Sequence, residues 1–456
     1  MTLPPDNQAR PTAVVFAVLA AGDEDGEERE RLAEIRELVE SADMDVVGLV
    51  VQHKARPDPR AYLGPGKLRE LRETVRSSGA TCAVCEDDLT PAQVAAVLDV
   101  VDVDVLDRTE LILTVFAAHA RSLEGRMQVD LAQLQYELTR VRGQGQILSR
   151  LGAGTDMRGP GEQKMEVDRR VIRHRIQTLR GRIERMARTR RTQRARRVRA
   201  DLPLLALAGY TNAGKSTLLN ALTAAGVPVR DRLFETLDPT TRSFRYHDRD
   251  YLITDTVGFI RKLPHLLVDA FASTLEETRT ADLLVIVTDA SLPADEIRAH
   301  QETVADVLAQ IGSSEVPRLL VMNKVDLVDA PARLRLAARE PDAVFVSAAS
   351  GEGLDELLAR VSAFFERTLV PVRLLVPYDQ GGVIDRLHGV ATGISQESTA
   401  DGTIIAARLP LREANRYAAL RIDLPATVAG HDDEAAHVRD DDDEPHETGA
   451  TGREAG

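Results

Sequence analysis

The stretch that decides the fold is Gly209-Tyr210-Thr211-Asn212-Ala213-Gly214-Lys215-Ser216-Thr217, which follows the apolar run 204–208. It fits the pattern G-x-x-x-x-G-K-[ST], in which a glycine-rich turn joins a buried strand to a helix. The glycines let the backbone turn tightly, so successive N–H groups and the helix N-terminus face a phosphate. Lys215 brings a positive charge to β- and γ-phosphates, and the Ser216 hydroxyl is an oxygen ligand suited to Mg²⁺. These nine residues predict a nucleotide site in an α/β fold.

Two further segments are expected at the phosphates. Asp255-Thr256-Val257-Gly258 ends the apolar strand 251–254. Asp255 can hold Mg²⁺ through a water molecule, and the Gly258 N–H can contact the γ-phosphate. Upstream lies the polar segment Asp238-Pro239-Thr240-Thr241. A threonine hydroxyl in that segment can complete the magnesium shell when a γ-phosphate is present, so we predict Mg²⁺ as the cofactor.

Two later segments predict which base is bound. Asn323-Lys324-Val325-Asp326 follows the strand 318–322, and Ser347-Ala348 follows the run 343–346. A carboxylate at Asp326 can accept hydrogen bonds from both N1–H and N2–H₂ of guanine, a pair that adenine cannot donate. Lys324 can lie along the base, and a backbone N–H near Ser347 and Ala348 can read guanine O6. We therefore predict a guanine-specific enzyme that hydrolyses GTP to GDP and phosphate.

The residue after Gly258 bears on the rate of that reaction. Many GTPases carry a glutamine there, which orients the attacking water. This chain has Phe259, whose ring can neither donate to nor accept from water. Slow intrinsic hydrolysis is expected, with water positioning left to backbone, another segment or a partner.

The sequence before the glycine-rich turn divides into two parts. Residues 12–113 alternate between strands and helices, which predicts an N-terminal α/β subdomain. Strands are expected at 13–20, 45–52, 81–85 and 102–106, and helices at 28–41, at 68–78 and from Thr90 onward. Cys82 and Cys85 would point to opposite faces of the third strand, which favours core packing over a metal site.

Residues 114–200 predict a helical hairpin. Apolar residues step by four and three in two series: Met127, Leu131, Leu134, Leu138 and Val141, and then Ile172, Ile176, Leu179, Ile183 and Met186. Such spacing is the seam of a pair of helices. Between the series, 143–161 holds six glycines with Arg150 and Arg158. Glycine disfavours helix, so a Gly/Arg-rich tip loop is expected at 143–161.

The remaining chain predicts three segments. Residues 201–370 form the P-loop GTPase domain, with buried parallel strands at 204–208, 251–254, 283–288, 318–322 and 343–346. Residues 371–426 form a small α+β unit that begins with the strand 372–377. Residues 427–456 are expected to be a disordered acidic tail. The fold class is α/β: a P-loop GTPase domain preceded by an α/β subdomain and a two-helix coiled-coil hairpin.

Composition limits the classes of function. The 456 residues include two cysteines, which argues against a disulfide scaffold, and no apolar stretch long enough to span a membrane. The net charge is −14, yet residues 121–200 carry a net +13 and residues 169–199 hold fourteen arginines with one acid. One basic segment on an acidic protein predicts a local contact with a polyanion, and arginine suits RNA.

The whole pattern resembles the HflX family of the Obg–HflX group of translation-related GTPases, over about residues 12–370. The stretches that carry the resemblance are Tyr62–Lys67, Leu106–Leu113, Met127–Leu134, Arg158–Glu162, Asp168–Arg170, Thr236–Thr240 and Asp255–Ile260. The family pattern assigns the magnesium-binding threonine to Thr240.

This resemblance implies binding to the large (50S) ribosomal subunit and its rRNA, stimulation of GTP hydrolysis there, and splitting of stalled or inactive ribosomes. A cytoplasmic monomer is expected, partly membrane-peripheral when free of ribosomes. The alternative is a nucleotide-gated switch that binds RNA or protein, or a ribosome-assembly GTPase, without splitting activity. The residues of the GTPase domain do not separate these alternatives, but the basic hairpin favours the first.

Overall fold

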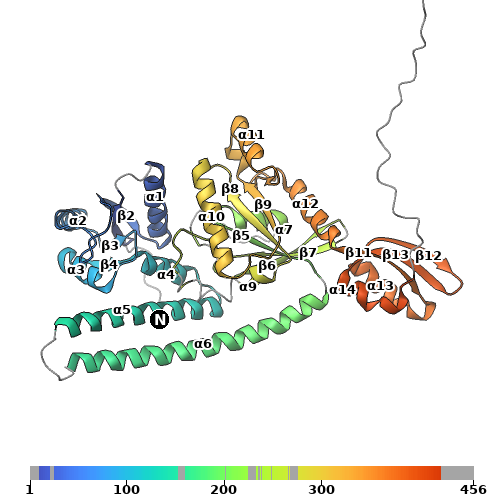
Figure 1. The fold of residues 1–456 in the computed structure, drawn as a ribbon, viewed down its shortest axis with the longest axis horizontal. Helices are drawn as coiled ribbons and strands as arrows, with labels where there is room; N and C mark the ends of the chain where they lie inside the picture. The colour runs from blue at the N-terminus through green and yellow to red at the C-terminus, as the bar shows by residue number, and fades with distance from the viewer. Residues whose placement is uncertain are drawn as a thin grey trace, which may run out of the picture. The chain divides into compact units, whose positions relative to one another are not determined.

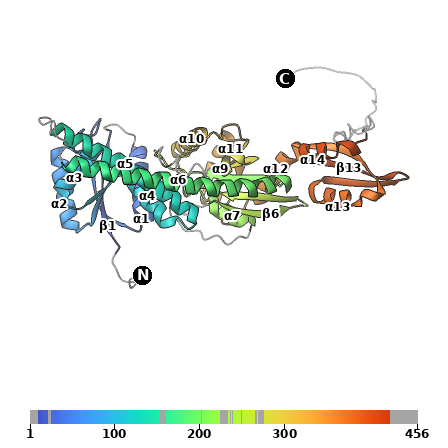
Figure 2. The same ribbon diagram turned by 90° about the horizontal axis from the view of Figure 1, so that it is seen from below.

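The computed structural model describes residues 10–20, 25–151, 160–200, 202–223, 233–234, 237, 239–247, 249–264, 267 and 276–422. Contacts divide the chain into two compact units, Met1–Arg367 and Thr368–Gly456 (Figures 1 and 2). The expected acidic tail 427–456 and the central part of the expected tip loop lie outside the described residues. Within the described ranges, no helix combines the length and the apolar content that a bilayer span requires.

The N-terminal subdomain is a parallel sheet covered on both faces. Its strands are β1 (Thr12–Leu19), β2 (Asp45–His53), β3 (Cys82–Cys85) and β4 (Asp104–Leu106), in the order β2-β1-β3-β4. The helices are α1 (Asp25–Ser41), α2 (Pro65–Ser78), α3 (Pro91–Val101) and α4 (Arg108–His119). Side chains of α1 and α4 pack on one face with Val15 and Cys82, and those of α2 and α3 pack on the other with Phe16 and Cys85. The opposite orientation of the two cysteines is therefore confirmed.

Local signals set the ends of these elements. Thr90 caps α3 with a reciprocal pair of hydrogen bonds to Gln93, as its position before Pro91 predicts. The expected strand 102–106 is shorter, because Asp102 has a φ of 58° and ends α3 in the left-handed conformation. Helix α4 runs across the predicted domain boundary between residues 113 and 114.

The hairpin consists of α5 (Leu123–Leu151) and α6 (Pro160–Ala200), which contact each other and run side by side in Figure 1. Three residues of its seam are buried, namely Leu131, Ile172 and Ile176. Partly buried side chains pack against them: Leu134, Leu138, Val141, Leu179 and Ile183. The prediction that the glycines stop the helix at residue 143 was wrong. Helix α5 continues through Gly143 and Gly145, and Gly161 lies in the first turn of α6. A glycine costs only about 1 kcal/mol relative to alanine inside a helix, which the rest of a long helix can offset.

The nucleotide-binding domain is a six-stranded sheet in the order β10-β9-β8-β5-β7-β6. The strands are β5 (Leu204–Gly209), β6 (Thr240–Tyr246), β7 (Arg249–Asp255), β8 (Leu283–Asp289), β9 (Arg318–Asn323) and β10 (Val344–Phe345). All pairs are parallel except β6 with β7. Parallel strands place their carboxyl ends at one edge, where loops from β5, β7 and β9 can meet around a ligand.

Helices cover both faces of this second sheet. Helix α10 (Ala294–Gln310) packs on one face, and α7 (Lys215–Thr223) and α12 (Leu354–Arg367) pack on the other. Helix α9 (Glu276–Thr280), the short 3₁₀ turn η1 (Val325–Leu327) and α11 (Ala330–Arg339) complete the domain. The face under α10 shares one apolar cluster with α1 and α4 of the N-terminal subdomain, including an edge-to-face pair of Phe116 and Phe234.

The second unit is a three-stranded antiparallel sheet with two helices. It contains β11 (Leu369–Val376), β12 (Thr392–Thr399) and β13 (Gly402–Pro410), in the order β11-β13-β12. Helices α13 (Gly381–Val390) and α14 (Leu411–Arg416) lie beside 3₁₀ turns at Tyr378–Gln380 (η2) and Ala418–Leu420 (η3). Val372, Leu374, Leu387, Ile405 and Leu409 form its own core, as expected for a small α+β unit.

Candidate nucleotide site

The glycine-rich turn lies between β5 and α7, as predicted. Neither of its two glycines has room for a side chain. A Cβ at Gly209 would lie 2.2 Å from the Val287 carbonyl oxygen, and one at Gly214 would lie 2.3 Å from Asn323 Nδ2. Asn212, at the tip of the turn, has a φ of 60°. Close packing against β8 and β9 therefore fixes the path of this turn and leaves its N–H groups at the sheet edge.

Lys215 is buried inside this turn. Its Nζ donates to the carbonyl oxygens of Gly209 at 3.2 Å and Tyr210 at 2.6 Å. Burial lowers the pKa of Lys215 to about 8, and the Asp255 carboxylate opposes that shift. A charge that carbonyl dipoles hold in place is available to phosphate oxygens without a large rearrangement.

Three oxygen-bearing side chains predicted to hold Mg²⁺ converge from three elements. Ser216 Oγ donates to Asp255 Oδ2 at 2.6 Å, and Asp255 is fully buried at the end of β7. Strand β6 places Thr240 directly opposite Asp255. The neighbouring Thr241 hydroxyl lies 2.9 Å from Thr254 Oγ1, within the β6–β7 ladder. Hydroxyl and carboxylate oxygens are the donor type that Mg²⁺ selects, so this set fits the ion.

The segment 256–262, called here the switch II segment, lies against the glycine-rich turn. Phe259 N donates to Gly209 O at 3.1 Å, and Thr211 N donates to Phe259 O at 2.8 Å. A Cβ at Gly258 would lie 2.8 Å from Thr211 Cγ2 and 2.9 Å from Lys215 Nζ. Only glycine fits at this position, which brings its backbone next to the buried Lys215.

The other residues of this segment have structural contacts. The Thr256 hydroxyl donates to the Leu207 carbonyl at 2.6 Å, and the side chain of Val257 is buried. Phe259 is 1% exposed and belongs to the apolar cluster under α10. Its ring is thus a core side chain, and it supplies no group that could orient water.

The predicted guanine-binding loops meet at the ends of β9 and β10. Asn323 Nδ2 donates to Ala213 O at 2.9 Å, and its Oδ1 accepts from Ala348 N at 3.0 Å. Lys324 has a φ of 63°, and its Nζ lies 2.7 Å from Asp289 Oδ2. Ser347 is fully buried, whereas Asp326 is exposed at the start of η1. Asn323 thus ties the glycine-rich turn to both guanine loops and leaves the Asp326 carboxylate accessible.

The side chain of Tyr210 leaves the nucleotide site. Its ring stacks on His300 of α10 with 3.6 Å between centroids, and its hydroxyl donates to the buried Glu34 of α1. Burial and the Glu34 carboxylate raise the pKa of Tyr210, so it stays a neutral donor. The same hydroxyl accepts from Arg261 N at 2.9 Å. Tyr210 therefore links the glycine-rich turn, the switch II segment and the N-terminal subdomain.

Arg108, at the start of α4, completes this link. The residue is 2% exposed, and its guanidinium pairs with Glu34 and donates to the Arg261 carbonyl at 3.0 Å. Further ion pairs join Arg261 to Glu27 and Glu30, and Lys262 to Asp87. The sequence does not indicate these partners, because Glu34 and Tyr210 lie 176 positions apart. Neither belongs to a motif that signals the pairing.

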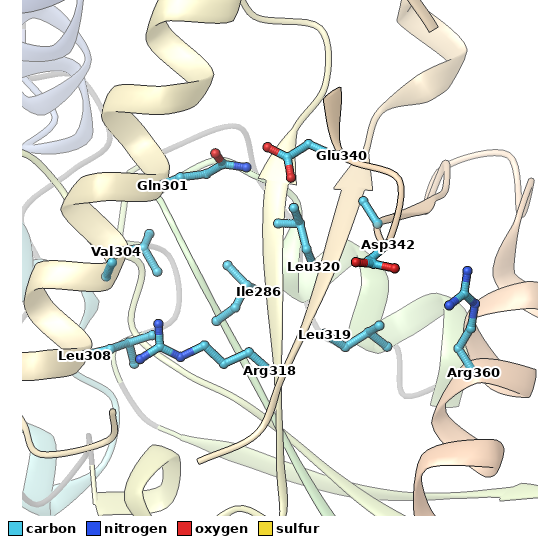
Figure 3. A pocket seen from close by; sticks show the side chains of 12 residues that line it. Ile286, Gln301, Val304, Leu308, Arg318, Leu319, Leu320, Glu340, Asp342 and Arg360 are labelled. Atoms are coloured by element: carbon cyan, nitrogen blue, oxygen red, sulfur yellow. The ribbon is translucent and has the colours of Figure 1, made fainter. Parts of the chain in front are cut away.

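A cavity of about 460 Å³ lies elsewhere in the same domain, at the other end of β9 (Figure 3). Arg318, Leu319 and Leu320 line it together with Gln301 of α10 and Arg360 of α12. None of the predicted site residues lines this cavity, so it is separate from the nucleotide site.

Comparisons with known proteins identify the family of this chain. Family models described as GTP-binding GTPase N-terminal, GTP-binding GTPase middle region and 50S ribosome-binding GTPase match residues 29–117, 119–197 and 204–324. GTPase HflX of Caldanaerobacter subterraneus is 44% identical over 80% of this chain and 84% of its own length, and that of Escherichia coli is 37% identical over 89% and 95%. A GTP-binding protein from Sulfolobus solfataricus, solved with GDP, covers 77% of this chain and 98% of its own at 24% identity and a TM-score of 0.43. The chain belongs to the HflX family of GTPases.

Proposed function

We propose that this GTPase binds the large ribosomal subunit through its helical hairpin and uses GTP to separate the subunits of stalled or inactive ribosomes. The observation that carries the proposal is the charge of α6. Arg170, Arg175, Arg180 and Arg182 are exposed, and none has an acidic partner within the part of the chain that the structure describes. A family model described as a 50S ribosome-binding GTPase supports the choice of partner. A ribosome-bound factor works in the cytoplasm, which is the location we propose.

The site residues suggest how this chain handles GTP. Mg²⁺, when bound by Ser216, Thr240 and, through water, Asp255, neutralises phosphate charge. Lys215 holds the β- and γ-phosphates, while Asn323 and Asp326 orient the guanine. This chain has Phe259 at the position where a glutamine could activate water. The Phe259 side chain is apolar and buried, so it cannot take over that role. We propose that turnover is slow alone and rises on the ribosome.

A path of contacts can carry the nucleotide signal to the hairpin. The backbone of Gly258 lies beside Thr211 and Lys215, which is where a γ-phosphate would contact its N–H. We infer that this contact shifts the switch II segment. Arg261 in that segment contacts Arg108. Asp107, which precedes Arg108 in the sequence, accepts hydrogen bonds from Tyr136 and Arg140 of α5. We infer that a shift at Arg261 is transmitted through Asp107 and Arg108 to the hairpin.

Subunit separation is tested directly by sucrose-gradient sedimentation of whole ribosomes with the full-length protein. With a non-hydrolysable GTP analogue, the proposal expects free small and large subunits, with the protein in the large-subunit fraction. Ribosomes that stay whole while the protein co-sediments would contradict splitting and favour the nucleotide-gated binding switch.

The hairpin is tested with a triple variant, Arg170→Gln, Arg175→Gln and Arg182→Gln. Each lost phosphate contact reduces the slope of log K against log salt by nearly one unit, so affinity for large subunits should fall and its salt dependence should flatten. A control variant changes the net charge equally by replacing three other exposed arginines with glutamine: Arg298 on α10, and Arg335 and Arg339 on α11. Equal losses in both variants would refute a specific role of α6.

Replacing 152–159 by a short Gly-Ser turn tests this segment separately. The affinity for GDP should not change, so any loss of binding to large subunits would come from the replaced segment.

A further inference from the structure

Arg333 of α11 bridges the two guanine-binding loops. Its Nε donates to the carbonyl oxygen of Val325 at 3.0 Å, and Nη2 donates to the same oxygen. That carbonyl belongs to the peptide bond between Val325 and Asp326, and under the proposed function Asp326 faces the guanine edge. The backbone of Asp326 is therefore held by two donors of one planar group.

The same guanidinium reaches the second loop. Nη1 donates to Glu352 Oε1 at 2.6 Å, and Nη2 donates to Oε2 at 3.2 Å. Glu352 in turn accepts from Ser347 N through its own carbonyl at 2.9 Å. This loop carries Ser347 and Ala348, so one arginine fork spans both halves of the base-binding site.

Local structure orients Arg333 for this task. Asp329 caps α11 by accepting from Ala332 N at 2.7 Å, and the Asp329 carbonyl accepts from Arg333 N at 3.0 Å. The side chain of Arg333 is 34% exposed and that of Glu352 is 50% exposed. An isolated surface ion pair contributes little to stability, so its fork geometry suggests a positional role.

We propose that Arg333 is a positioning residue for guanine specificity. Through its bonds to Val325 and Glu352, it keeps Asp326 at the distance of one base from the Ser347–Ala348 loop. Asp326 attracts the N2 amino group of guanine and repels the O2 carbonyl of xanthine. A carboxylate that moves freely attracts the amino group less and repels the carbonyl less. The difference between its affinities for guanine and xanthine therefore becomes smaller. Ordering one side chain costs an amount of free energy that corresponds to a change of roughly two- to twelvefold in affinity.

The test measures the dissociation constants of GDP and XDP for the full-length protein carrying Arg333→Ala. The ratio of the XDP to the GDP constant should fall by roughly two- to twelvefold, because GDP binding weakens while XDP is rejected less strongly. A purely structural defect would weaken both nucleotides equally and leave this ratio unchanged. An unchanged ratio in the folded variant overturns the proposal.

Further variants keep the test informative. Arg335→Ala removes an exposed arginine of the same helix and should leave the ratio unchanged. Arg333→Lys keeps the charge but loses the fork, so its ratio should be intermediate. If Arg333→Ala does not fold, Glu352→Gln weakens one end of the bridge, and its ratio should also fall. The double variant Arg333→Ala and Glu352→Ala should lose no more than the larger single effect, since both substitutions break one bridge.

Discussion

The phosphate end and the base end of the nucleotide site are held in different ways. At the phosphate end, Lys215, Asp255, Tyr210 and Glu34 are buried, and the last two tie the site to another subdomain. At the base end, the partly exposed Arg333 and the exposed Glu352 bridge two neighbouring loops. Buried ionised groups are costly to leave unpaired, whereas exposed ones are screened by solvent. We therefore expect changes at the phosphate end to affect turnover and subdomain contacts, and changes at the base end to affect selectivity.

The largest effect is expected for Lys215→Ala, which should remove measurable GTP turnover. The variant lacks the only lysine of the glycine-rich turn and its charge on the β- and γ-phosphates. Because burial disfavours the charged lysine, the midpoint of thermal unfolding should not fall. Phosphate release assays measure the turnover. Hydrolysis at the wild-type rate would place the active site elsewhere.

Asp326→Asn should change selectivity by roughly 10⁴-fold in favour of xanthine nucleotides. An amide presents its own NH₂ to guanine and cannot accept from both guanine donors, but it suits the O2 of xanthine. Competition between GTP and XTP measures the change. A variant that still prefers GTP would show that Asp326 does not read the base.

Glu34→Ala should separate the two ends most clearly. It leaves the buried Arg108 without its carboxylate partner, and breaking a buried ion pair costs roughly 3–5 kcal/mol. The midpoint of thermal unfolding should fall by several degrees, while the ratio of XDP to GDP affinity stays at its wild-type value. Glu40→Ala, at an exposed position of the same helix, serves as the control. A changed base preference in Glu34→Ala would show that the two ends are coupled.

The smallest effect is the pH dependence of the phosphate end. The pKa of Lys215 is lowered to about 8 by burial, so the free site loses its positive charge as pH rises above that value. The affinity for GDP should then fall by up to about tenfold per pH unit. GMP shares the base but lacks the β-phosphate, so its affinity controls for titration of guanine. An equal pH dependence for GMP and GDP would exclude Lys215 as the cause.

Sequence alone determined the features that depend on neighbouring residues. The glycine-rich turn, Asp255–Gly258 and Asn323–Asp326 each follow a strand, because the backbone geometry of a strand end and its loop is local. The seam of the hairpin was also predictable, since helical periodicity places Leu131 and Ile176 on apolar faces. Propensity failed at Gly143 and Gly145, because a weak local preference does not end a long helix.

Only the tertiary structure decided which distant residues meet. Tyr210 lies in the motif that sequence assigns to phosphate, yet its side chain binds Glu34 of another subdomain. Arg333 and Glu352 belong to no recognised motif, and they meet only because the fold brings α11 beside the loop after β10. A side chain's partner depends on where the sheets and helices pack, and that packing is a property of the whole chain rather than of any one segment.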